Sequence, residues 1–188
     1  MKTPFLVGDR IYLRPLERED LNEKYLKWLN DPQVNRYLES GLFPSARDGL
    51  EEFYKRVSSS GDVILAIAEK ESDEHIGNVK LGPINWVHRR ATFGILIGEM
   101  RFWGRGIGTE ATKLMVEYGF FRLNLRKIDL GVYACHEAAV RLYETVGFKI
   151  EGRFREDLFN NGAYTDRIWM GLLRSEYRDP MSTIGEGQ

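Results

Sequence analysis

The stretch RFWGRGIGTEATK, residues 101–113, decides the fold of this chain because it separates an apolar run from a long amphipathic one. Glycine alternates with other residues in it, at positions 104, 106 and 108. Each glycine costs about 0.5–1 kcal/mol of backbone entropy relative to alanine, so their concentration indicates a special demand on the backbone. A glycine-rich loop ahead of a helix exposes N–H groups at the positive end of the helix dipole. The stretch therefore predicts either an anion-binding loop or a turn that lets a strand and a helix pack closely.

The spacing of these glycines fits neither of two common nucleotide-binding motifs. A phosphate-binding P-loop requires G-x-x-x-x-G-K-[ST], which the sequence does not contain. The dinucleotide-binding fingerprint requires G-x-G-x-x-G, whereas this chain has G-x-G-x-G. Arg101 and Arg105 flank the loop and Thr109 adds a hydroxyl at the helix start, and such groups bind phosphate. An anion at this loop would therefore be bound by a different motif.

Downstream of the loop, the apolar pattern alternates between helix and strand. One helical stripe, which we expect to end near residue 123, consists of Ile107, Ala111, Leu114, Met115 and Tyr118. Residues 127–134 alternate as in a strand, and a second helix ends before Gly147. The Asn160-Asn161-Gly162 sequence predicts a hairpin turn between the last two strands.

Upstream of the loop, a strand and two helices precede three further strands. We expect the first strand at 10–16, a helix that ends near Asp31-Pro32, and a second helix at 45–57. The strands at 63–70, 75–85 and 90–98 form a plausible meander. The element order predicts a mixed α/β (α+β) fold, with one domain over residues 1–178 and a flexible tail at 179–188.

The composition excludes several classes of partner. The 27 Lys and Arg residues nearly balance the 28 Asp and Glu residues, so no net charge favours nucleic acid or an anionic membrane. We see no apolar signal sequence at the N-terminus and no run near the roughly 20 apolar residues that span a bilayer. The single cysteine, Cys135, forms neither an internal disulfide nor a Cys-x-x-Cys metal cluster. We therefore expect a cytoplasmic protein without a structural metal.

Two segments resemble the signature motifs of the GNAT acetyltransferases. The first is W-G-R-G-I-G-T-E-A, at the loop, and the second is Y-A-C-H-E-A-A-V-R-L-Y-E-T-V-G-F, which follows it in the chain. The phrases RIYLRPLERED, LNDPQVNRYL, INWVHRRA and FNNGAYTDRIWM are similar to the branch that contains the ribosomal-protein and spermidine acetyltransferases. Within that branch, GNVKLGPINWVHRRATFGILIGE looks most like enzymes that acetylate nucleotide-linked amino sugars. The resemblance covers residues 8–178.

The resemblance implies a fold and an activity. The family fold is a central, mostly antiparallel sheet of about seven strands flanked by about four helices. In it, the strand before the loop diverges from the strand at residues 127–134, and the gap between the two strands is the cofactor slot. The implied activity is transfer of the acetyl group of acetyl-CoA to a primary amine, with a nucleotide-linked amino sugar as the leading acceptor. A ribosomal-protein N-terminus or a polyamine such as spermidine is the alternative acceptor. A non-catalytic CoA-binding regulatory module is the alternative of another class, and a homodimer through an exposed late strand stays open.

The resemblance also implies which residues hold the cofactor. They are Gly104, Arg105, Gly106, Ile107, Gly108 and Thr109 in the pyrophosphate loop, Leu96, Ile97 and Gly98 in the strand before it, and Arg101 and His136. Two positions depart from the family pattern. Trp103 stands where Gln or Arg is usual, and we expect its ring to fill core space, with Arg101 as a substitute cation. His136 stands where Asn is common, which affects one cofactor contact.

Amine acetylation requires removal of a proton from the amine and delivery of one to the departing thiolate. Tyr143 matches the tyrosine of the family's LY-x-x-x-GF segment, and the resemblance implies that it protonates the departing thiolate. The alternative is that Tyr143 is an aromatic residue of the core. As the base that removes the amine proton we prefer Glu99, at the end of the strand before the loop. His88 and ordered water are the alternatives.

We expect the acceptor to meet the first two helices and the strand end at GPINW. The predicted contacts are Asn35, Arg36, Tyr37, Asn85 and Trp86. An aromatic ring such as Tyr37 or Trp86 suits a sugar or a nucleobase, whereas a polyamine requires several carboxylates. The acidic residues Glu39, Glu51 and Glu52 keep the polyamine open as an acceptor.

Overall fold

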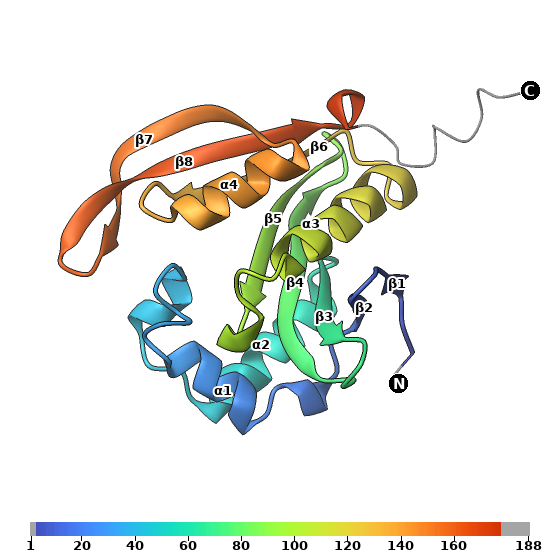
Figure 1. Ribbon diagram of the computed structural model, residues 1–188, viewed down its shortest axis with the longest axis vertical. Coiled ribbons are helices and arrows are strands. Elements are labelled where there is room, and N and C mark those ends of the chain that lie inside the picture. The colour runs from blue at the N-terminus through green and yellow to red at the C-terminus, as the bar shows by residue number, and fades with distance from the viewer. Residues whose placement is uncertain (1–2, 178–188) are drawn as a thin grey trace, which may run out of the picture.

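The computed structural model describes residues 3–177, which form one eight-stranded sheet with helices on both faces (Figure 1). The strand order is β1-β2-β3-β4-β5-β6-β8-β7. The strands are β1 Leu6–Val7, β2 Ile11–Pro15, β3 Val63–Glu69, β4 His75–Asn85, β5 Arg90–Ile97, β6 Lys127–Tyr133, β7 Lys149–Asn160 and β8 Ala163–Leu173. The helices are α1 Glu23–Asn30, α2 Arg47–Ser59, α3 Ile107–Glu117 and α4 Glu137–Val146.

The sheet divides between β5 and β6, which form its one parallel pair among the described strands. These strands are paired from Arg90 opposite Lys127 only as far as Thr92 opposite Asp129. Beyond that point, β5 stays paired with β4 up to Ile97, while β6 stays paired with β8 up to Tyr133. The two strands therefore diverge, and the sheet has the splay that the family resemblance implied.

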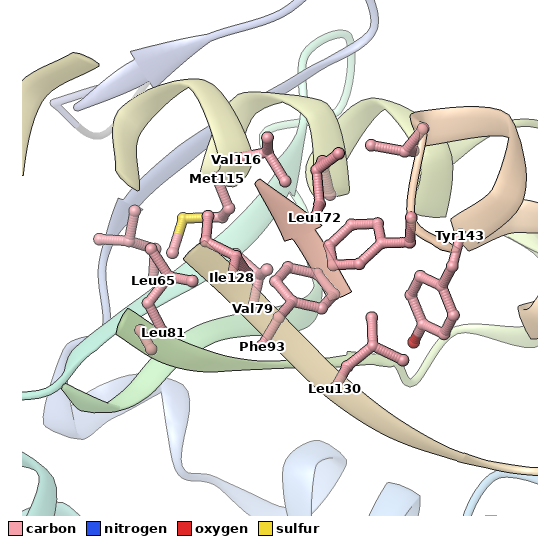
Figure 2. Packing of buried hydrophobic residues seen from close by; sticks show 14 of the residues in the cluster. Leu65, Val79, Leu81, Phe93, Met115, Val116, Ile128, Leu130, Tyr143 and Leu172 are labelled. Carbon is pink, nitrogen blue, oxygen red and sulfur yellow. The ribbon is translucent and has the colours of Figure 1, made fainter. Parts of the chain in front are cut away.

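Two hydrophobic clusters hold the helices against opposite faces of the sheet. The main cluster joins α3 and α4 to strands from both sides of the splay, with Met115 and Ile128 fully buried (Figure 2). The smaller cluster joins α1 and α2 through Tyr25, Trp28 and Leu50, and Leu96 of β5 packs against it. The alternating side chains of β5 therefore serve both faces.

A buried ion pair anchors the segment that leads into α1. Arg14 on β2 and Asp20 form two hydrogen bonds of 2.6 Å, and both side chains are nearly inaccessible to solvent. Burial opposes the charge on Asp20, but the bonds from Arg14 and from the Glu17 N–H outweigh it, so the pKa of Asp20 lies below its usual value. The pair fixes where α1 begins relative to the sheet.

The predicted helices and strands are confirmed, with small differences in their ends. The helix after the glycines continues beyond α3 as a π-helical turn, Tyr118–Arg122, which accounts for the predicted end near residue 123. Asn161 and Gly162 both have positive φ, of 49° and 84°, as a two-residue hairpin turn of this type requires. The two-residue strand β1 was not predicted, since so short a strand has no periodic pattern.

The described residues contain no helix that is long and apolar enough to cross a membrane. Residues 3–177 also contain no group of three or more His, Cys, Asp or Glu side chains arranged to hold a metal ion. The predicted tail at 179–188 lies outside the described residues. The division into one domain and a tail stays a prediction.

Candidate active site

The glycine-rich loop presents its backbone at the start of α3. Gly104 and Gly106 have left-handed conformations, with φ of 70° and 77°, and Gly106 is the N-cap of α3. Among residues 3–177, no group accepts a hydrogen bond from the N–H groups of residues 104–109. The positive end of the helix dipole adds to these free donors. The loop therefore has the geometry of an anion site.

The third glycine of the loop has a packing role. A Cβ at position 108 would lie 2.8 Å from Cδ1 of Leu142 on α4. Gly108 therefore lets α3 and α4 approach closely. Gly104 and Gly106 thus set the backbone conformation of the loop and Gly108 serves close packing, while anion binding by the loop stays a prediction.

Arg101 does not point to the loop, contrary to the prediction that it replaces a phosphate-binding cation. Its guanidinium pairs with Glu74, and its Nε lies 3.7 Å from Oε2 of Glu99. Glu74 directly precedes β4 and Glu99 follows β5, and these two carboxylates hold the Arg101 side chain away from the glycine-rich loop. The cation found beside the loop is Arg10, which the sequence did not indicate; its contact with the Arg105 carbonyl spans 95 residues.

Trp103 does not fill the core, because its side chain is 44% exposed. Its indole N–H donates a 2.8 Å hydrogen bond to the carbonyl oxygen of Ile97. The expectation of core filling was wrong, because the ring has a polar partner at the surface. Trp103 ties the beginning of the loop to the end of β5.

The splay leaves one edge of β5 open. From Phe93 onward, no described strand pairs with the edge of β5 that faces β6. A pantetheine arm has amides that can pair with such an edge as a strand does. Gly98, one of the predicted cofactor residues, makes room for α1, because a Cβ there would overlap the indole ring of Trp28. Leu96 faces α1 and α2, and Ile97 packs on the main core.

Tyr143 lies where the splay begins. Its ring makes edge-to-face contacts with Phe93, the first β5 residue beyond the last β6 pair, and with Phe148. Figure 2 shows it at one end of the labelled cluster. Burial raises the pKa of Tyr143 to about 12, and its hydroxyl has no hydrogen-bond partner among the described residues. The structure therefore places a neutral phenol with a free proton at the narrow end of the slot.

We expect this phenol to stay protonated across the usual assay range. A tyrosine with the ordinary pKa of about 10 loses half its protons near pH 10, whereas a pKa of about 12 keeps the neutral form there. The turnover number kcat at saturating substrates should therefore not fall between about pH 8 and 10. A pH profile of kcat checks this, and a decline centred at or below about pH 10 would contradict it.

Glu99 lies at the wide end of the slot, between β5 and the loop. Its Oε1 accepts a 3.0 Å hydrogen bond from Nε1 of Trp28 and lies 3.7 Å from Nζ of Lys24. His88 lies in the turn between β4 and β5, at the opposite end of the 8-residue β5 strand, roughly 25 Å along the strand. Of the two candidate bases, the structure brings only Glu99 to the loop.

The segment between α1 and α2 reaches the start of α4. The Tyr37 ring stacks on His136, the residue before α4, with centroids 4.0 Å apart and planes at 15°. Burial and the charge of Arg36 lower the pKa of His136, so the imidazole is neutral at neutral pH. The segment is also joined to the β7–β8 hairpin, by Asn160 to the Arg36 carbonyl and by Arg167 to Glu39. A predicted cofactor residue and predicted acceptor residues are thus in contact.

The structure does not bring the other predicted acceptor residues together. Asn85 and Trp86 lie at the β4–β5 turn, with His88, because an antiparallel hairpin sends its turn to the end opposite Glu99. Asn35 donates through its side chain to the Leu29 carbonyl at 2.8 Å, so it closes the end of α1. Of the five predicted residues, Arg36 and Tyr37 lie beside His136, and their acceptor role stays a prediction.

Comparisons with known proteins agree with this geometry. The family model described as acetyltransferase (GNAT) domain matches residues 10–149. Spermidine N(1)-acetyltransferase of Escherichia coli (strain K12) is 35% identical over 178 residues, which cover 94% of this chain and 92% of the relative. The spermidine N-acetyltransferase from Vibrio cholerae, solved with CoA and spermine, has a TM-score of 0.82 and 34% identity, and the match covers 89% of this chain and 98% of that one.

Proposed function

Because the chain belongs to the GNAT family and transfers the acetyl group of acetyl-CoA to an amine, we propose that its acceptor is a polyamine of the spermidine and spermine class. The observation that carries the proposal is the identity of 35% to a spermidine acetyltransferase along nearly the full length of both chains. The chain is an enzyme, which sets aside a non-catalytic role on the same fold.

The charges at the wide end of the slot support a cationic acceptor. Glu74 and Glu99 lie there, with Lys24 and Arg101 between them. Burial opposes the charge of Glu74, but Lys24 and Arg101 outweigh it, so its pKa lies below its usual value and the carboxylate stays charged. A polyamine ammonium can replace such a partner for a carboxylate. Glu39, paired with Arg167, adds a third acidic group on the facing segment.

The amino sugar, predicted as the leading acceptor, has less support than the polyamine. The comparisons favour the polyamine. The aromatic residues expected to face a sugar do not form a platform: Trp86 is at the far end of β5, and one face of Tyr37 is covered by His136. The two rings predicted to face a sugar or nucleobase, Tyr37 and Trp86, are therefore not brought together.

We assign the chemical steps to residues along the slot. The N–H groups of residues 104–109 hold the pyrophosphate of acetyl-CoA, and the open edge of β5 pairs with the pantetheine arm. The amine nitrogen attacks the thioester carbon and loses its proton to ordered water, which carries it to Glu99, because Glu99 and Tyr143 lie at opposite ends of the slot. As the carbon–sulfur bond breaks, Tyr143 donates its proton to the thiolate and regains one from solvent. The free phenol proton of Tyr143 is the structural support for the last step.

A panel of amines tests the acceptor. We expect saturable release of free CoA thiol with spermidine and spermine, and rates near background with a nucleotide-linked 4-amino sugar or with peptides that carry ribosomal-protein N-termini. The physical reason is that carboxylates at the wide end of the slot recognise more than one ammonium group. Diaminobutane, which has fewer ammonium groups, serves as the control and should require a higher concentration. Faster turnover of the amino sugar would reverse the assignment.

Self-association stays a prediction. The Vibrio cholerae spermidine N-acetyltransferase has also been solved as a dodecamer. In this chain β7 is an unpaired edge strand of the described sheet, and its exposed side chains include Ile150 and Phe154. Figure 1 shows the β7–β8 hairpin arching over α4. An edge of this kind is available to a second copy.

A further inference from the structure

One side chain joins the start of β2 to the pyrophosphate loop and to α3. Arg10 donates from Nη1 to the carbonyl oxygen of Arg105 and from Nε to Oε2 of Glu110, the latter at 3.2 Å. The backbone N–H groups of Arg10 and Ile11 donate to Oε1 of Glu110 at 2.9 and 3.2 Å. The Glu110 side chain is only 13% exposed. These contacts link segments that are 95–100 residues apart.

The contact with the Arg105 carbonyl determines the direction of the next N–H group. In a planar trans peptide the C=O and the following N–H point in opposite directions. With the carbonyl of Arg105 held toward Arg10, the N–H of Gly106 points to the other side of the loop. Glycine tolerates either orientation of this peptide, since it lacks the Cβ that restricts other residues. Among the described residues, Arg10 alone donates a hydrogen bond to the Arg105 carbonyl oxygen.

Arg10 also offsets a charge that would oppose an anion. Glu110 lies in the first turn of α3, next to the free N–H groups of residues 104–109. A carboxylate at this place weakens the local positive potential unless a cation pairs with it. The guanidinium of Arg10 supplies that cation. The guanidinium also favours glycine at position 106, because a Cβ there would lie 2.9 Å from Nη2 of Arg10.

We propose that Arg10 is a positioning residue that holds the Arg105–Gly106 peptide so that the Gly106 N–H faces the pyrophosphate of CoA. The proposal rests on the assignment of residues 104–109 to that group. Arg10 acts through the loop and does not itself bind the 3′-phosphate of CoA. Its removal affects ligands that carry the pyrophosphate and no others.

Arg10→Met tests this, because methionine keeps an unbranched side chain without a donor or a charge. The ligands are CoA, dephospho-CoA, which keeps the pyrophosphate, and pantetheine, which lacks it. We expect dissociation constants from calorimetry to rise about tenfold for CoA and for dephospho-CoA, the factor for one hydrogen bond of about 1.4 kcal/mol, and to stay unchanged for pantetheine. Lys70→Met is the matched control, since Lys70 donates to the Gly8 carbonyl in the same segment without touching the loop.

Each other outcome overturns the proposal for a different reason. An equal loss for pantetheine would indicate a general loosening of the fold. A larger loss for CoA than for dephospho-CoA would indicate direct contact with the 3′-phosphate, and an equal loss in Lys70→Met would indicate a net-charge effect. No amine is present, so the results do not depend on the polyamine assignment. If the wild-type enzyme bound CoA no better than pantetheine, the placement of the pyrophosphate at residues 104–109 would fail first.

Discussion

Replacement of Tyr143 by phenylalanine is expected to lower kcat about 100-fold, the low end of the effects that follow removal of a general acid. Acetyl-CoA binding should be retained, because the ring keeps its contacts with Phe93 and Phe148. Stability should change little, since the lost hydroxyl has no hydrogen-bond partner among the described residues and its pKa of about 12 keeps it neutral. Steady-state kinetics with spermidine, together with calorimetry of acetyl-CoA binding, measure the two quantities separately.

Tyr25→Phe is the matched control for this variant. Tyr25 is also buried, and burial likewise raises its pKa to about 12, but it belongs to the small cluster under α1 and α2. Its hydroxyl accepts a 2.9 Å hydrogen bond from Asn78, so the control should lose about 1 kcal/mol of stability and keep its kcat. If Tyr143→Phe kept wild-type kcat, or if both variants lost it equally, Tyr143 would have no part in proton transfer.

Replacement of Gly106 by glutamate is expected to weaken acetyl-CoA binding about 100-fold, or about 2.7 kcal/mol. Gly106 has φ of 77°, where a residue with a Cβ is strained by about 1–2 kcal/mol. The new Cβ would crowd the guanidinium of Arg10, and the new carboxylate would compete for it. A negative charge beside the free N–H groups would also oppose the pyrophosphate. Calorimetry with acetyl-CoA measures the loss.

Gly61→Glu controls for both strain and charge. Gly61 has φ of 72°, close to that of Gly106, and a Cβ there would meet no atom within 4 Å. It lies in the turn between α2 and β3, away from the loop. Backbone strain should therefore destabilise the two variants by similar amounts, while only Gly106→Glu loses affinity. Equal affinities in the two variants would remove Gly106 from the cofactor site.

Local patterns predicted the secondary structure because their causes are local. The 3.6-residue stripe of α3, the alternation in β6 and the Asn-Gly turn each depend on residues within a few positions of one another. The loop at residues 104–109 was accessible to prediction for the same reason, since its glycines and its helix are contiguous. Tyr143 was assigned to catalysis through the family motif, because its own apolar surroundings predict a core residue equally well.

The remaining site depends on partners that are distant in the sequence. Arg101 was assigned to the loop from its position in the chain, but Glu74 lies closer to it in space. Gly98 was assigned to the cofactor, but Trp28 occupies the space that its missing side chain leaves. Arg10 gave no signal, because nothing near it in sequence indicates a contact with Arg105. Such contacts follow from the assembled sheet, and no local pattern encodes them.

The open edge of β5 bears on the tendency of the enzyme to aggregate in a crowded solution. A strand with unpaired N–H and C=O groups invites other chains to add to it, and this is a common route to aggregation. Here that edge lies inside a wedge whose other side is β6, and Tyr143 of α4 packs against Phe93 at its apex. An added strand would need β5 and β6 about 10 Å apart, twice the usual strand spacing, whereas the two strands are directly paired as far as Thr92 and Asp129. The narrowing of the wedge thus limits how much of this unpaired edge another polypeptide chain can reach.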